Sequence, residues 1–118
     1  MLQFQVAALD EIGMVRASIR DEPFANSVVE ADIEVLNAII SELIGAAFDS
    51  RVDPPMVVTV ETFAKLHSIR VRVANDVQHV DDPFRLRERI LQGLTLAFGQ
   101  RHNGDGTVDL WAEVERTT

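Results

Sequence analysis

One acidic side chain lies inside a strongly apolar stretch of the sequence, and this is the only site-like pattern that the chain shows. The stretch is segment 41–47, SELIGAA, in which Glu42 is the single charged residue. Gly45, three residues further on, lowers helix propensity by about 1 kcal/mol relative to alanine. Both residues therefore require a structural or functional reason.

The remaining residue types that support chemistry form no motif. His67, His79 and His102 have no spacing that would place two imidazoles on one helix face, so we interpret them as solvated or locally bonded and assign no metal site. The chain has no cysteine, which excludes disulfides and thiolate metal ligands. It has no G-x-S-x-G elbow, P-loop or dinucleotide fingerprint, and the glycines of segment 103–106 are typical of a turn.

Trp111 and a run of charged residues each favour an ordinary interpretation. Trp111 falls on the polar face of the last predicted strand, where it is either a common sheet residue or an anchor for a protein partner. Arg85, Arg87, Glu88 and Arg89 are interpreted as the solvated face of a helix. Neither group identifies a reaction.

The element that carries Glu42 is predicted to be one long amphipathic helix over residues 27–48. Its apolar residues recur at spacings of four and three, which places them on one helical face. They are Val29, Ile33, Leu36, Ile40, Leu43 and Ala47. Ser27 and Glu30 form the S-x-x-E pattern of a capping box, which marks the start of the helix.

Periodic segments on either side of this helix predict the remaining elements. Strands are predicted at 2–7, 56–63, 68–74 and 107–115, and helices at about 10–20 and 82–98. The first strand is expected at an edge of the sheet, and the second and third form a hairpin joined near residues 64–67. This order predicts an α+β fold. It is a two-layer sandwich with helices on one face of a four-stranded, mostly antiparallel sheet, whose other face is at least partly open.

Length and charge narrow the functional class. The 118 residues are enough for one domain, 1–118, with a single core. With 19 acidic and 11 basic residues the net charge is -8, which repels a phosphate backbone, so no nucleic acid partner is expected. No segment has the length of a membrane span or the pattern of a leader, so we expect a cytoplasmic protein with no membrane partner.

Several short motifs, taken in order, resemble one family. They are SEL at 41–43, V-x-N-D at 73–76, Q-G-L at 92–94 and G-T at 106–107. The opening F-Q-V-A-A, with Val15, Arg16 and Ile19 after it, is similar to the first strand and helix of that family. Over nearly all its length the chain thus resembles the anti-sigma-factor serine kinases of bacteria. These are small members of the GHKL (Bergerat) ATP-binding fold, which implies a mixed sheet.

The resemblance implies a catalytic role for Glu42. In the family a glutamate at this place orients a water, and Glu42 matches it. An asparagine four residues later binds magnesium in the family, but this chain has Ala46 at that position. Because a methyl group offers no oxygen to a cation that demands oxygen ligands, no metal site is implied.

The residues that the resemblance assigns to the nucleotide are Asn75, Gly93, Leu94 and Thr107. Asn75 takes the place of the aspartate that accepts the adenine amino group, while Val77 and His79 replace two glycines of the same motif. The phosphate-facing turn retains only the second of its glycines, Gly93. The implied ATP site is therefore degenerate.

These losses favour a regulatory domain without kinase activity. We expect it to bind a protein partner, a sigma factor or an anti-sigma antagonist, with no cofactor or only weak ATP and Mg. One alternative is an active ATP-dependent serine kinase, in which Glu42 is the base and Asn75 reads adenine. Another is a small structural or oligomer-forming domain, in which Glu42 is a helix-edge residue, Asn75 a turn former and Gly93 a packing glycine. Family members of this size pair, so a homodimer through the edge strand 2–7 is expected.

Overall fold

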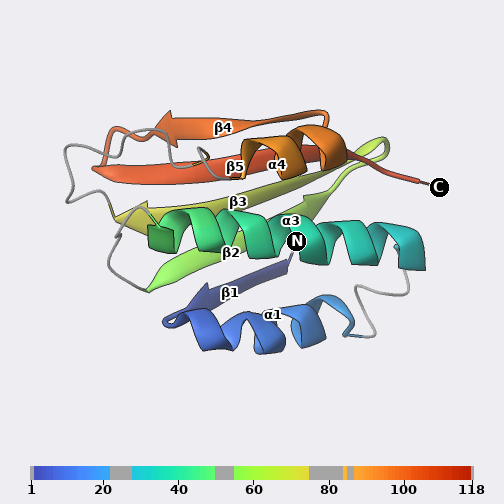
Figure 1. Cartoon of the computed structure of the whole chain (residues 1–118), viewed down its shortest axis with the longest axis horizontal. Helices are drawn as coiled ribbons and strands as arrows, with labels where there is room; N and C mark the ends of the chain where they lie inside the picture. The colour runs from blue at the N-terminus through green and yellow to red at the C-terminus, as the bar shows by residue number, and fades with distance from the viewer. Residues whose placement is uncertain (1, 22–27, 50–54, 75–83, 85–86, 118) are drawn as a thin grey trace.

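The computed structural model describes residues 2–21, 28–49, 55–74, 84 and 87–117. Within this part of the chain three α-helices, one 3-10 helix (η1) and five β-strands follow one another as Figure 1 shows. Their bounds are β1 Leu2–Val6, η1 Leu9–Glu11, α1 Ile12–Ile19, α3 Glu30–Asp49, β2 Met56–Thr62, β3 Leu66–Ala74, α4 Glu88–Leu94, β4 Ala97–His102 and β5 Thr107–Glu115. The predicted α+β class is confirmed.

The strands form one sheet in the order β1-β2-β3-β5-β4. β1 lies at one edge, as the sequence predicts, and β4 lies at the other. Two expectations are wrong. The described part of the sheet has five strands instead of four, and all its neighbouring pairs are antiparallel, so it is not mixed.

The helices cover one face of the sheet, which gives the two layers seen in Figure 1. α3 contacts β3 and β5 and lies between α1 and α4. Alternate strand residues such as Ile69, Val71 and Leu110 are buried in the core that α3 shares with the sheet, whereas Val29, predicted on the apolar helix face, is 39 % exposed. No helix of the described residues is long and apolar enough to cross a bilayer.

The third predicted helix is the main error in the sequence interpretation. A helix is predicted over 82–98, but α4 ends at Leu94 and β4 follows, while residues 82–83 lie outside the described part of the chain. Thr95 has an extended backbone, and the N–H of Leu96 donates to a carbonyl of β5 at 2.7 Å. The apolar spacing at this point fits a helix end and a strand start equally well, because periodicity over so few residues does not separate them.

Two other boundaries differ by a few residues. α3 begins at Glu30, and Ser27, the other half of the predicted capping box, lies outside the described residues. Glu30 accepts a hydrogen bond at 2.5 Å from Arg20, which follows α1. The turn between β2 and β3 covers residues 63–65, so His67 belongs to β3 and not to the connection.

A tight turn joins β4 to β5, as the sequence predicts for residues 103–106. The N–H of Asn103 donates to the carbonyl of Thr107 at 2.8 Å, and the Asp105 carboxylate accepts from the N–H of Thr107 at 3.0 Å. Gly106 has a φ of 87°, in the left-handed region that favours glycine. This glycine therefore has a conformational reason for its place.

Replacing Gly106 with alanine is expected to lower the free energy of unfolding by about 1 kcal/mol, because a left-handed backbone brings Cβ against the neighbouring carbonyl. Gly104→Ala is the matched control, since a Cβ there meets no atom within 4 Å and Gly104 has no positive φ. Urea unfolding compares the two variants. Equal midpoints for both would contradict this explanation.

Candidate functional site

Glu42 is not free on the surface of α3. Arg87, directly before α4, donates from Nη1 to Glu42 Oε2 at 2.7 Å, although the two residues are 45 positions apart. The same guanidinium donates from Nε and Nη2 to Asp49 Oδ2 at 3.2 and 3.0 Å. The Arg87 side chain is 26 % exposed, so its interpretation as part of a solvated helix face is wrong.

Gly45 lies between the two acids on the same face of α3, and its missing side chain lets Arg87 approach. A Cβ built on Gly45 would lie 2.6 Å from the guanidinium carbon, closer than real Cβ atoms come to other heavy atoms. Any larger residue would therefore displace the Arg87 guanidinium. Arg87 thus explains both unusual residues of the segment: it pairs with the Glu42 carboxylate, and it needs the space left by Gly45.

The charge of Arg87 is fixed. Burial works to lower the pKa of its guanidinium, but the hydrogen bonds to Glu42 and Asp49 and their negative charges outweigh burial and raise that pKa further above its usual value. Arg87 is thus a permanent cation that occupies one carboxylate oxygen of Glu42. The bond holds the Glu42 side chain against Arg87, so a water or a proton would be met mainly by the other oxygen, Oε1.

The position that holds magnesium in the similar family offers no ligand. Ala46 is fully buried on α3, and its methyl group cannot coordinate a cation. Among the residues that the structure describes, no three His, Asp or Glu side chains are grouped so that they could hold a metal ion.

Three of the residues assigned to the nucleotide are described, and none of them makes a hydrogen bond or ion pair with Glu42. Asn75 lies outside the described residues. Gly93 is exposed in the last turn of α4, and a Cβ there would meet no atom within 4 Å, so packing does not require a glycine. Leu94 is half-buried against the core. Across the described residues, no hydrogen bond or ion pair joins Glu42, Gly93 or Thr107 to one another.

Thr107 has a local structural role. Its hydroxyl donates to Asp105 Oδ1 at 2.6 Å and accepts from the Asn103 amide at 2.9 Å. Both partners belong to the β4–β5 turn. The hydrogen bonds to Asp105 from the hydroxyl and the backbone N–H of Thr107 lower the pKa of the Asp105 carboxyl. The hydroxyl of Thr107 thus closes the turn.

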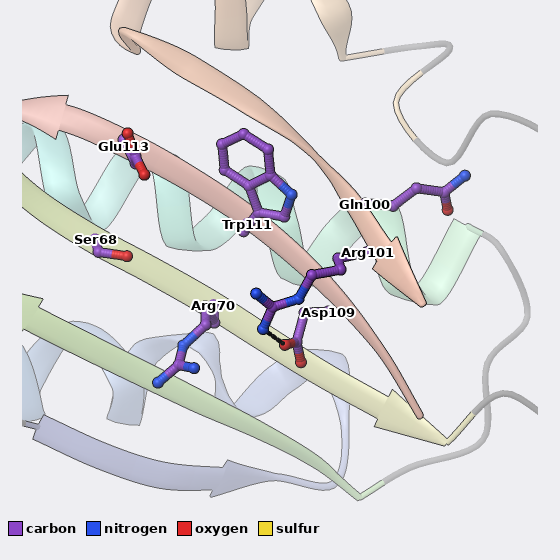
Figure 2. A pocket seen from close by; sticks show the side chains of 7 residues that line it. All are labelled: Ser68, Arg70, Gln100, Arg101, Asp109, Trp111 and Glu113. Carbon is purple, nitrogen blue, oxygen red and sulfur yellow. Dashed lines mark hydrogen bonds and ion pairs between the residues drawn. The ribbon is translucent and has the colours of Figure 1, made fainter. Parts of the chain in front are cut away.

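The face of the sheet opposite the helices is open and carries a groove of about 430 Å³. Figure 2 shows side chains from β3, β4 and β5 around it, with Trp111 among them. Trp111 lies on the polar face of β5 as predicted and is half-buried. Its ring lies against Gly99 of β4, where a Cβ would come within 3.1 Å of the indole.

A buried carboxylate orders one end of this groove. Asp109 is 1 % exposed and accepts hydrogen bonds from Arg72 Nε at 2.8 Å and from Arg101 Nη2 at 3.1 Å. Burial alone would raise the pKa of Asp109, but the hydrogen bonds and charge of Arg72, with smaller help from Asn103 and Arg101, lower it. Strand alternation places Asp109 on the polar face together with Trp111, and gives no sign that its carboxylate is buried.

A second buried polar cluster joins α3 to the sheet. The Nε2–H of His67 donates to Asp32 Oδ2 at 2.9 Å, and Thr62 Oγ1 lies 2.9 Å from His67 Nδ1. The backbone N–H of Thr117 donates to the same Asp32 oxygen at 2.8 Å. His67 is fully buried and hence locally bonded, whereas His102 is exposed.

Asp32 is an ionised acceptor in this cluster. Burial works to raise the pKa of its carboxyl, but the hydrogen bonds from His67 and Thr117 lower that pKa below its usual value. An ionised carboxylate can only accept, which assigns a proton to His67 Nε2. Because Asp32 and His67 are buried and satisfy each other's hydrogen bonds, we assign the cluster to stability.

Comparison with known proteins adds no relative. No protein-family model matches the chain, and a search of curated proteins found no match. The resemblance to anti-sigma-factor serine kinases therefore rests on the motifs quoted above.

Proposed function

We propose that this chain is a non-catalytic regulatory domain that binds a protein partner, and that it is a degenerate relative of the anti-sigma-factor serine kinases of the GHKL fold. The observation that carries the proposal is the ion pair between Arg87 and Glu42, 2.7 Å long. It occupies the one carboxylate to which the resemblance assigns catalysis. A carboxylate held against a permanent cation is less available to orient a water than an unpaired one.

The chemistry of phosphoryl transfer supports the same conclusion. Such catalysis depends on positioning a metal ion and the phosphates, with little covalent work for the protein. Ala46 supplies no metal ligand, and the hydroxyl of Thr107 is used by its own turn. The chain has lost the groups that the reaction needs while it keeps an ordered two-layer fold.

The nature of the partner follows from charge and from the resemblance. A net charge of -8 opposes binding to a nucleic acid backbone. The resemblance implies a protein partner, of the class of a sigma factor or an anti-sigma antagonist. The domain acts by occupying that partner, without ATP or Mg as a required cofactor.

Millimolar Mg-ATP is expected to shift the melting temperature by less than about 1 °C, because Glu42 is already paired and no metal ligand replaces Ala46. A nucleotide present at about a hundredfold excess over its Kd would stabilise the fold by about 2.7 kcal/mol. Such a gain would raise the melting temperature of a domain of this size by several degrees, which thermal unfolding detects easily.

Arg87→Ala, measured in parallel, shows whether the guanidinium alone blocks the site. If Mg-ATP raises the melting temperature of the variant but not of the wild type, the Arg87 guanidinium is what prevents nucleotide binding. Phosphate transfer from labelled ATP is expected for neither protein. Micromolar ATP binding by the wild type, or phosphorylation of a serine in a partner, would overturn the non-catalytic proposal.

A further inference from the structure

The groove on the open face of the sheet is distinct from the Glu42 region, which lies in the helical layer. Its volume of about 430 Å³ is in the range of ligand sites, roughly 300 to 1,000 Å³. Side chains from three adjacent strands line it in Figure 2. The register of these strands determines how its charges are arranged.

Strand pairing sets the side chains of the open face, at and beside the groove, in three rows across β3, β5 and β4. The rows are Ser68 with Glu113, then Arg70 with Trp111 and Gly99, then Arg72 with Asp109 and Arg101. Adjacent rows are two residues apart along each strand, so the first and third rows are separated by about 14 Å. The groove therefore has two ends with Trp111 between them.

Trp111 provides an apolar surface at the centre. The indole lies over Gly99, where a Cβ would meet its ring at 3.1 to 3.4 Å. Glycine at this position allows the ring to lie close to β4. Tryptophan is among the side chains that most often dominate protein interfaces, since it buries a large area with little loss of rotamer freedom.

The end formed by the third row is cationic. Two guanidinium groups, of Arg72 and Arg101, surround the single buried carboxylate of Asp109. The Arg101 side chain is 60 % exposed and, with the described residues, makes one bond only, to Asp109. Arg101 is thus held in place while most of its donors remain available, which suits an incoming carboxylate.

The opposite end is anionic. Glu113 is half-buried and makes no side-chain hydrogen bond or ion pair with any described residue. Its neighbour across the strand pair is the hydroxyl side chain of Ser68. A carboxylate next to an indole ring favours a basic side chain, which can pair with the charge and contact the ring face.

We propose that this groove binds an extended segment of a protein partner in which a basic, an apolar and an acidic side chain follow one another at every second residue. Alternate side chains of an extended chain point to the same side, and the outer two lie about 14 Å apart, as the two ends of the groove do. The base meets Glu113, the apolar side chain covers Trp111 and the acid meets Arg101. This inference rests on the proposed function, for which it names the surface that meets the partner.

Trp111 makes the proposal directly measurable, because the chain has one tryptophan and no tyrosine. The probe is a nine-residue synthetic peptide without aromatic residues, with Lys, Leu and Glu at its third, fifth and seventh positions and serine elsewhere. A scrambled peptide of the same composition is the control. The matched peptide is expected to change the Trp111 fluorescence in a saturable way, and the scrambled one is not.

Charge reversal tests each end of the groove. Glu113→Lys should weaken binding of the matched peptide at least tenfold, and a peptide with Glu in place of its Lys should restore it. Arg101→Glu should likewise weaken binding of the matched peptide at least tenfold, and a peptide with Lys in place of its Glu should restore it. Arg89→Glu is the charge-matched control, since Arg89 is exposed on α4 in the helical layer. Arg101→Glu places a second acid beside Asp109 and can destabilise the fold. If it does, the test with Glu113→Lys and its swapped peptide decides alone.

Three results with the peptides would overturn the proposal. They are no fluorescence change up to about 1 mM of matched peptide, an equal response to the scrambled peptide, and no rescue by the swapped peptides. A fluorescence change that depends on protein concentration without peptide would also overturn it, because a second copy would then cover the groove. The nucleotide assays are read separately. A protein that ignores both ATP and the peptide refutes the groove alone, and one that binds ATP refutes the proposed function.

Discussion

Asp32→Ala is expected to lower the free energy of unfolding by about 3 kcal/mol, because it leaves a buried donor without an acceptor and removes the acceptor of a second donor near the surface. One is His67 Nε2–H and the other is the N–H of Thr117, and both donate to the same oxygen of Asp32. Neither water nor another carboxylate replaces this oxygen easily, since Asp32 is 4 % exposed and His67 fully buried. Urea unfolding at neutral pH measures the loss.

The same pair makes stability depend on acid. The pKa of folded Asp32 is lowered from its usual 3.8. The contribution of Asp32 is therefore fully present above about pH 4 and is lost as the pH falls through the folded pKa. The difference in stability between the wild type and Asp32→Ala should accordingly be largest near neutrality and shrink below that pKa.

Thr62→Val is the control for this prediction, since it removes only the hydroxyl beside His67 Nδ1. Its expected cost is about 1 kcal/mol, with little dependence on acid. If Asp32→Ala were as stable as Thr62→Val at neutral pH, the cluster would not have the structural role assigned to it.

Arg87→Ala is expected to lower the free energy of unfolding by about 2 kcal/mol, between the values for exposed and for buried ion pairs. The variant removes both ion pairs that connect the residue before α4 to α3. It also leaves Glu42, whose side chain is 20 % exposed, without its partner. Chemical denaturation measures this loss, and the midpoint should fall without a change in slope.

Gly45→Ala separates the effect of Arg87 from general damage to the helix. Alanine favours a helix over glycine by about 1 kcal/mol, yet its Cβ would displace the guanidinium that lies 2.6 Å away. In the wild type these effects should nearly cancel. In the Arg87→Ala background the same change should stabilise by about 1 kcal/mol. Additive effects in this double-mutant cycle would show that Gly45 does not serve Arg87.

Much of the fold follows from local pattern. The spacing of apolar residues in segment 27–48 predicts the long helix, and alternation predicts β2, β3 and β5 to within a few residues. β4 is not predicted because six residues, 97–102, contain too few apolar positions to show a strand period. Its place is set by pairing with β5, which is tertiary information.

The candidate site is harder to predict because its contacts are distant in sequence. Local reasoning identifies Glu42 and Gly45 as residues that need a reason. Local reasoning places Arg87 in solvent, although Arg87 explains both residues, because its contact with Glu42 spans 45 residues. The pairing of His67 with Asp32 spans 35 residues and has no local signature. The position of Trp111 on the polar face of β5 is predicted correctly, because strand alternation alone determines the face on which a side chain lies.

The pairing of β1 has a consequence for how the chain reaches its folded state. Among the described strands β1 pairs with β2 alone, and its partners Leu2 and Val60 are separated along the chain by α1 and α3. The hairpins β2–β3 and β4–β5 close short loops, so they can form early, whereas β1 must close a long one. We therefore expect β1 to be the last strand to dock and the first to open. When it opens, it uncovers the edge of β2, where Val58 and Val60 alternate with polar residues and another chain could add a strand.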